Sequence, residues 1–239
     1  MNKSLVKHLD LSENSTLSEH FYKKLGGIMQ DEMAVLERLE FEDNRIGDQT
    51  LVNLIDDCIE GGRVSFFNVS KNQITDIGAK AIARLIRNSD NLRLLFLHYN
   101  KILGVGGIDI ANAIGFSKSI QVLDISYNSI TGTGIKIIKD EPPEGEKLSP
   151  KKSPKKGLKT DKNQSTAGKG FAELFHQGFA EPWARALRKN KSLIHVDMSH
   201  NNIRLDDVEI IADGLKDNHH ILGLHFVGND GNVDPKGFV

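Results

Sequence analysis

Apolar and polar residues alternate over three to five positions at seven places in the chain, and each alternation ends at an asparagine. The frame is L-x-x-L-x-L-x-x-N-x-I, as in the run from Leu36 to Ile46. The asparagines that close the seven copies are Asn14, Asn44, Asn72, Asn100, Asn128, Asn201 and Asn229. Alternation of this kind predicts a short strand with one buried face, and the asparagine predicts a turn.

The steps in residue number between successive asparagines are 30, 28, 28, 28, 73 and 28. The step of 73 equals one period of 28 plus 45 extra positions, which predicts an insertion within a continuous series of repeats. Between the strands, apolar residues recur every three or four positions, which predicts a helix in each repeat. Two such series are Leu51, Leu54, Ile55 and Cys58, and Ile77, Ala81, Ile82, Leu85 and Ile86.

A strand, a turn and a helix in each 28-residue period resemble the leucine-rich repeats of the ribonuclease-inhibitor-like class. The resemblance implies an α/β solenoid of about seven repeats, with a curved parallel sheet inside and helices outside. No repeat buries its apolar face alone, so neighbours must stack. We expect repeats 1–5 in residues 1–138, an insert in residues 139–170, and a helix with repeats 6–7 in residues 171–239.

Two stretches resemble leucine-rich-repeat proteins of ciliated protists, many of which belong to the ciliary axoneme. These stretches are Trp183–Leu193 and Leu222–Gly231. The resemblance implies a place in a multi-subunit axonemal assembly. The start Asn2–Leu5 matches Asn190–Leu193, the junction that leads into a strand, so we expect the chain to be a piece of a longer stack. The alternative is that partners cover both ends.

The predicted insert is rich in Lys, Ser and Pro and poor in apolar residues, so we expect a disordered, solvated loop. It carries nine lysines against five acidic residues, while the whole chain has a formal net charge of −1. Two Ser-Pro-Lys-Lys units place Ser149 and Ser153 in the setting of proline-directed phosphorylation sites. Minor-groove binding is a second interpretation, and a plain soluble insertion is a third.

Composition predicts a cytoplasmic protein. The single cysteine, Cys58, cannot form an internal disulfide, which favours a reducing compartment. No apolar run reaches the roughly 20 residues that a membrane span needs. We therefore expect no membrane association, and the near-neutral charge argues against nucleic acid as a partner.

No catalytic or metal-binding pattern emerges from the sequence. The glycine-rich run Gly104–Gly107 lacks the following Lys-Ser/Thr of a phosphate-binding loop. Cys58 falls on an apolar helix stripe, which predicts a buried structural thiol. Histidines fall on or near several predicted strands, but a metal site needs three or four of them to converge. We expect no cofactor, no metal and no enzymatic activity.

The residues between the buried strand positions point away from the core and form an exposed sheet face. The middle repeats place apolar and aromatic residues there, and the first repeats place acids there, a composition typical of protein-binding sites. We therefore predict a partner-binding face made by Phe66, Leu94, Phe96, His98, Tyr99, Val122 and Tyr127, flanked by Glu40, Glu42 and Asp43.

The sequence thus predicts a non-enzymatic scaffold that binds a protein partner on its concave face. The alternative is an accessory GTPase-activating protein, because the nuclear-transport activators share this type of repeat. Those proteins carry an acidic tail and positioning residues in loops at the strand ends. Neither an acidic tail nor a matching loop arginine is found in this sequence.

Overall fold

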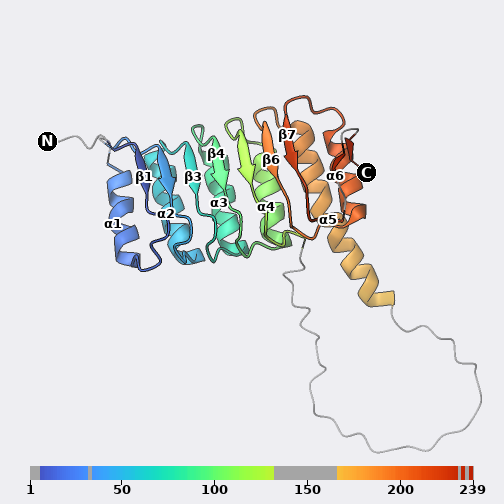
Figure 1. The fold of residues 1–239 in the computed structure, drawn as a ribbon, viewed down its shortest axis with the longest axis horizontal. Helices are drawn as coiled ribbons and strands as arrows, with labels where there is room; N and C mark the ends of the chain where they lie inside the picture. The colour runs from blue at the N-terminus through green and yellow to red at the C-terminus, as the bar shows by residue number, and fades with distance from the viewer. Residues whose placement is uncertain (1–5, 32–33, 132–165, 231–232, 235–236, 239) are drawn as a thin grey trace, which may run out of the picture.

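Short strands and longer helices alternate along the chain in the computed structural model, which describes residues 6–31, 34–131, 166–230, 233–234 and 237–238 (Figure 1). The strands are β1 (His8–Asp10), β2 (Arg38–Glu40), β3 (Phe66–Asn68), β4 (Leu94–Phe96), β5 (Val122–Asp124), β6 (His195–Asp197), β7 (Gly223–His225), β8 (Val233–Asp234) and β9 (Gly237–Phe238). The helices are α1 (Glu19–Met29), α2 (Asp48–Gly61), α3 (Asp76–Asn88), α4 (Gly104–Ile114), α5 (Thr166–Lys189) and α6 (Leu205–Leu215).

Strands β1 to β7 form one parallel sheet in sequence order, and the helices lie in a second layer on one side of it (Figure 1). The register is constant, with Leu39 opposite Phe67 and Phe67 opposite Leu95. It continues across the long step between Asn128 and Asn201, because Leu123 pairs with Val196. The predicted α/β leucine-rich-repeat solenoid is confirmed.

The apolar positions of the repeat frame form one continuous core between the sheet and the helices. Phe41, Phe67 and Trp183 are fully buried there. Cys58 is buried among them, and burial raises the pKa of its thiol, which agrees with a structural role. Ile77 departs from the prediction, since it is 66% exposed. It is the second residue of α3, and the buried face of that helix begins at the next residue, Gly78.

The strand-ending asparagines, here called the ladder asparagines, connect successive repeats through their side chains. The amide nitrogen of Asn72 donates to the carbonyls of Val69 and Ser70 in its own repeat and to Phe41 in the repeat before. Its oxygen accepts the backbone N–H groups of Asn44 and Ile46. Each side chain therefore satisfies turn groups that the sheet leaves unpaired. The predicted burial of these side chains is confirmed at Asn72, Asn128 and Asn201, while Asn100 is half-buried.

The residue before each ladder asparagine has a left-handed backbone. This holds for Glu13, Asp43, Lys71, Tyr99, Tyr127, His200 and Gly228, with φ between 51° and 77°. The left-handed turn lets the strand end and directs the next residue, the asparagine, into the core. Six of the seven positions accept a side chain despite the cost of this conformation, about 1 kcal/mol each. The backbone here is set by the repeat, and the identity of the side chain is free to vary.

The aspartate that begins one helix also binds the start of the next helix. The Asp48 carboxylate at the start of α2 accepts the backbone N–H groups of Thr75 and Gly78, and the Thr75 hydroxyl donates to it. Asp76 at the start of α3 accepts the N–H groups of Leu103 and Gly106 in the same way. The glycine-rich run Gly104–Gly107 is thus the first turn of α4, and the backbone N–H of Gly106 within it already donates to the Asp76 carboxylate.

Helix α5 corrects the predicted boundary of the insert. It begins at Thr166, before the predicted end of the loop at residue 170. Pro182 lies inside α5, and the helix continues through it although proline cannot donate a backbone hydrogen bond. Phe179 and Trp183 on either side are fully buried, and burying two large aromatic side chains outweighs the roughly 3 kcal/mol cost of an internal proline. Residues 132–165, which include Ser149 and Ser153, lie outside the described residues.

Candidate functional site

The sheet face opposite the helices, here called the open sheet face, holds the columns that the repeat frame predicts. One column runs through His8, Arg38, Phe66, Leu94, Val122, His195 and Gly223. Another runs through Asp10, Glu40, Asn68, Phe96, Asp124, Asp197 and His225. The predicted site residues that belong to strands therefore lie side by side on β2 to β5.

Phe66 does not lie open on this face, contrary to the prediction. Its residue exposure is 8%, because the Arg38 guanidinium lies 3.5 Å above its ring and Phe96 packs against it with ring centroids 5.1 Å apart. The cation–π contact and the ring pair shield Phe66 from both sides. Leu94, Phe96 and Val122 are half-buried. Arg38, which the sequence did not single out, thus belongs to the site.

Three aromatic side chains form a stacked row at the edge where the strands end. Tyr99 and Tyr127 are stacked with centroids 4.0 Å apart and planes 12° apart, and His200 stacks on Tyr127 at 4.2 Å and 20°. We call Tyr99, Tyr127 and His200 the aromatic rim. The tyrosines are 47% and 39% exposed, and a hydrogen bond with Tyr99 raises the pKa of Tyr127. The sequence prediction omitted His200, although it occupies the same place in its repeat as the two tyrosines.

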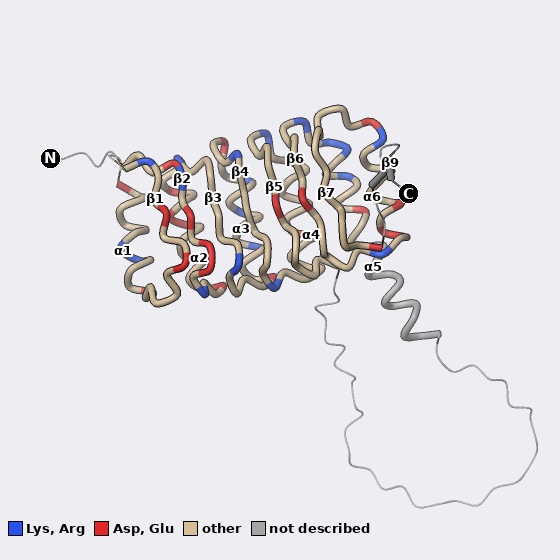
Figure 2. The backbone as a smooth tube through the Cα atoms, viewed as in Figure 1, with Lys and Arg blue, Asp and Glu red and all other residues tan. Residues whose placement is uncertain are grey.

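The predicted acidic group is largely neutralised within the chain. Glu40 lies 2.9 Å from Arg38 and 2.7 Å from His8, and Glu42 lies 2.7 Å from Lys71. The Lys71 hydrogen bond lowers the pKa of Glu42. Asp43 is exposed at the same edge. Figure 2 shows acidic positions along β1 and β2 and beside α2, and further ones on β5 and β6.

A hydrogen-bonded network crosses the centre of the open sheet face. His98 Nδ1 lies 2.9 Å from Asp124 and 2.9 Å from the Ser70 hydroxyl, and the Ser126 hydroxyl donates to Asp124 at 2.7 Å. Burial alone would raise the pKa of Asp124, but the His98 and Ser126 hydrogen bonds outweigh it and lower the pKa. The ring edge of His98 also contacts Tyr99 at 5.9 Å. These hydrogen bonds hold the His98 ring in place, and His98 in turn packs against Tyr99 at one end of the aromatic rim.

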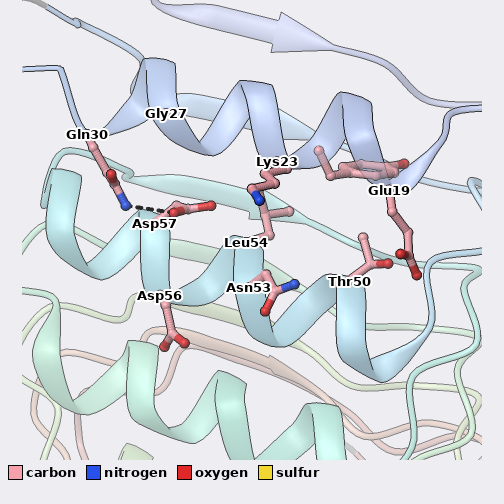
Figure 3. Close-up of a pocket in the computed structure, with 10 residues that line it drawn as sticks. Glu19, Lys23, Gly27, Gln30, Thr50, Asn53, Leu54, Asp56 and Asp57 are labelled. Carbon is pink, nitrogen blue, oxygen red and sulfur yellow. Dashed lines mark hydrogen bonds between the residues drawn. The ribbon is translucent and has the colours of Figure 1, made fainter.

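A hollow of about 590 Å³ lies between α1 and α2 on the helix side and contains none of the predicted site residues (Figure 3). Most of the residues that line it have polar side chains, and Gln30 donates to Asp57 at 2.8 Å. Burial, together with the charge of Asp56, raises the pKa of Asp57. One lysine, Lys23, faces several carboxylates and amides there, and this mixture indicates a solvated groove between helices.

Within the described residues, no group of three or more His, Cys, Asp or Glu side chains converges as a metal site would require. None of the helices in the described part of the chain is long and apolar enough to cross a membrane.

The Leucine Rich repeat family profile matches residues 66–83, 116–138 and 189–212. The chain is a leucine-rich-repeat protein. Its 28-residue repeats, each with a full helix, place it with the ribonuclease-inhibitor-like type. No curated protein matches it in sequence.

A solved structure shares the fold of this leucine-rich-repeat protein. The tropomodulin C-terminal domain of Caenorhabditis elegans superposes with a TM-score of 0.53 at 13% identity, covering 82% of this chain and 91% of that one. The structure of leiomodin-1 actin-binding site 2 gives a TM-score of 0.45 at 16% identity. That match covers 48% of this chain and 66% of the leiomodin-1 chain. At 13% identity, the likeness to the tropomodulin domain is one of fold.

Proposed function

We propose that this leucine-rich-repeat protein is a non-enzymatic scaffold that binds a protein partner across the middle of its open sheet face. The aromatic rim carries the proposal. Tyr99 and Tyr127 are large, solvent-exposed aromatic side chains at positions where the repeat requires only a left-handed backbone. The same position holds Glu13, Asp43 and Lys71 in the earlier repeats, so the fold does not call for an aromatic ring there.

The stacking prepares these residues for binding. Because each ring is held by its neighbour at about 4 Å, little side-chain freedom remains to be lost when a partner covers the rim. An aromatic side chain removes roughly 150–250 Å² from water when it is buried, so two tyrosines and a histidine supply a large part of an interface core. The tyrosine hydroxyls add hydrogen-bonding groups at the same edge.

Beside the rim, half-buried Leu94, Phe96 and Val122 continue the apolar surface onto β4 and β5. Seven strands at about 4.8 Å spacing span roughly 30 Å, which is enough to seat a helix or a small domain. The ion pairs of Glu40 and Glu42 flank this surface on the side of the first repeats. In this arrangement the apolar centre supplies affinity and the charged flank supplies orientation.

The setting we propose is a multi-subunit assembly of the ciliary axoneme. This rests on the resemblance of Trp183–Leu193 and Leu222–Gly231 to leucine-rich-repeat proteins of ciliated protists. A fluorescent fusion expressed in a ciliated cell tests it. Signal along the axoneme that survives detergent extraction supports the proposal, and a diffuse signal confined to the cell body contradicts it.

The decisive experiment identifies the partner and then measures its affinity. Crosslinking and pull-down from the source cell name the candidate, and calorimetry on purified proteins compares Tyr127→Asn and Phe96→Ala with the unmodified chain. Asparagine accepts the left-handed backbone at position 127, so folding is preserved. Each change should weaken binding by about 2 kcal/mol, whereas Ile77→Ala on the helix side should not change it. If Tyr127→Asn folds normally and binds as tightly as the unmodified chain, the rim is not the binding site.

A further inference from the structure

Phe116 is a large apolar residue that lies exposed on the helix side of the molecule. It follows the last turn of α4 and is 78% exposed. Counted from the ladder asparagine, the same place in other repeats holds Glu60, Asn88 and Asp217. The repeat therefore puts a polar residue at this position, and a phenylalanine there contributes nothing to the core. A large exposed apolar side chain at a normally polar position indicates a binding role.

Phe116 borders a hollow of about 130 Å³ between α4 and α5. Gly115, Ala186 and Pro182 form part of its lining. The hollow is open because Gly115 has no side chain at a place where α3 carries Arg87. A methyl group on Gly115 would meet its nearest neighbour, the Cα of Ala186, at 3.4 Å, an ordinary contact. Close packing of the two helices thus does not require glycine here.

Two cations stand at the edge of this hollow. Arg185 and Lys189 line it and are exposed, and among the described residues neither forms an ion pair. In contrast, Arg188 on the same helix pairs with Asp213, and Arg84 on α3 pairs with Asp56. No carboxylate is among the described residues that line the hollow. Lys189 also favours the C-terminal end of α5 through the helix dipole, but that effect does not account for Phe116 or for the hollow.

We propose that Phe116 and this hollow form a second docking site, which takes an acidic segment of a partner protein carrying one or two apolar side chains. An apolar side chain fills the hollow against the Phe116 ring, and neighbouring carboxylates pair with Arg185 and Lys189. The hollow has the volume of about four water molecules, which suits one aliphatic side chain. The site lies on the helix side and is independent of the aromatic rim, so the molecule joins two partners on opposite faces.

Synthetic peptides test the proposal on the full chain. The probe is a fluorescein-labelled peptide of about a dozen positions, with glutamates around a central Leu-Phe pair. One comparison peptide has alanines in place of the pair, and a second has lysines in place of the glutamates. Fluorescence anisotropy should show binding of the first peptide, at least tenfold weaker binding of the alanine peptide, and no binding of the lysine peptide. Raising the salt concentration should weaken the first interaction.

Variants of the chain locate the binding. Phe116→Asn introduces the residue that α3 carries at this position, and Gly115→Leu fills the hollow. Each substitution should weaken binding of the acidic peptide at least tenfold. Arg185→Glu should weaken it and reduce its salt dependence. Tyr127→Asn and Ile77→Asn are the controls and should leave it unchanged. Melting curves and NMR amide spectra of each variant confirm that the fold is retained.

Three outcomes would overturn the proposal. The first is that no peptide binds at millimolar concentration or below. The second is that Phe116→Asn, folded normally, binds the acidic peptide as tightly as the unmodified chain does. The third is that a short DNA duplex or anionic vesicles bind the basic edge with the same affinity whether or not Phe116 is present, which would assign Arg185 and Lys189 to non-specific polyanion binding.

Discussion

At the scale of single residues, the ladder asparagines stabilise the stack of repeats through hydrogen bonds to buried backbone groups. A buried backbone group without a partner costs about 1–3 kcal/mol, and each asparagine side chain serves several such groups at once. Asn201 is fully buried and donates to the carbonyls of Ile125, Met198 and Ser199. An amide is suited to this place because it both donates and accepts, which neither a hydroxyl nor a carboxylate does with the same geometry.

We expect Asn72→Ala to lower the free energy of unfolding by about 3 kcal/mol, because it leaves five backbone partners without the side chain that binds them. Urea denaturation measures the loss. The matched control is Asn14→Ala in the first repeat, where the side chain is exposed and water replaces its bonds; the loss there should stay below about 1 kcal/mol. Equal losses at both positions would contradict the role assigned to burial.

Asp124 should make the stability of the protein depend on pH. Its pKa in the folded state is lower than in the unfolded chain, so its ionised form stabilises the fold. That contribution is fully present above the unfolded pKa of about 3.9 and is lost as the pH falls through the lower folded value. In denaturant titrations at several pH values, Asp124→Asn should cost about 1–2 kcal/mol near neutral pH and progressively less below about pH 4. A difference that stays constant down to about pH 2 would contradict this.

At the scale of elements, the helices are linked by more than apolar packing. The Asp48 carboxylate joins α2 to α3 through three hydrogen bonds, and Gly78 leaves the room that this carboxylate needs. A methyl group at Gly78 would lie 2.6 Å from Asp48 Oδ1. An aspartate in one repeat and a glycine in the next therefore form a pair, and the same pair recurs as Asp76 and Gly106.

Asp48→Ala should destabilise the protein by about 2 kcal/mol, because the first turn of α3 loses the acceptor for two backbone N–H groups. Asp56→Ala on the same helix removes an ion pair with Arg84 in which both side chains are about half exposed, and it should cost less than about 0.5 kcal/mol. Thermal unfolding of the two variants compares them directly. If Asp56→Ala proves the more damaging change, the carboxylate link between helices has been overestimated.

At the scale of the whole molecule, the solenoid places the two candidate binding surfaces on opposite sides. The open sheet face carries the aromatic rim and the half-buried apolar residues of β4 and β5, and the helix side carries Phe116 with its hollow. Acidic positions lie along β1 and β2 in the first repeats and also on β5 and β6 (Figure 2). Because the two surfaces lie on opposite sides of the buried core, one can change in sequence without disturbing the other.

Glu42→Lys should act on partner association mainly through its rate. The substitution removes the ion pair with Lys71 and adds positive charge to the flank of the open sheet face, away from its apolar centre. Stopped-flow measurements with the identified partner should show a changed association rate and salt dependence, and a dissociation rate within about twofold of the unmodified value. A large change in dissociation alone would move Glu42 into the centre of the interface.

The sequence by itself determined the architecture, because a repeat with a constant register leaves one way to stack. The repeat period, the buried positions and the column neighbours on the sheet could all be read from the frame. The step of 73 residues from Asn128 to Asn201 could be interpreted from the same frame, as one repeat period plus extra residues. Leu123 pairs with Val196, so the register continues across this step. The aromatic side chains at Tyr99 and Tyr127 were predicted to be accessible for the same reason, and they are.

Only the tertiary structure decided which side chains of the exposed columns are available. Alternation along a strand gives the direction of a side chain, but its exposure depends on neighbours in adjacent strands. Arg38 and Phe96 cover Phe66, Lys71 neutralises Glu42, and His200 extends the row of tyrosines. Likewise, the frame gives the position of Phe116, whereas the hollow beside it exists only because α5 packs against α4 where Gly115 has no side chain.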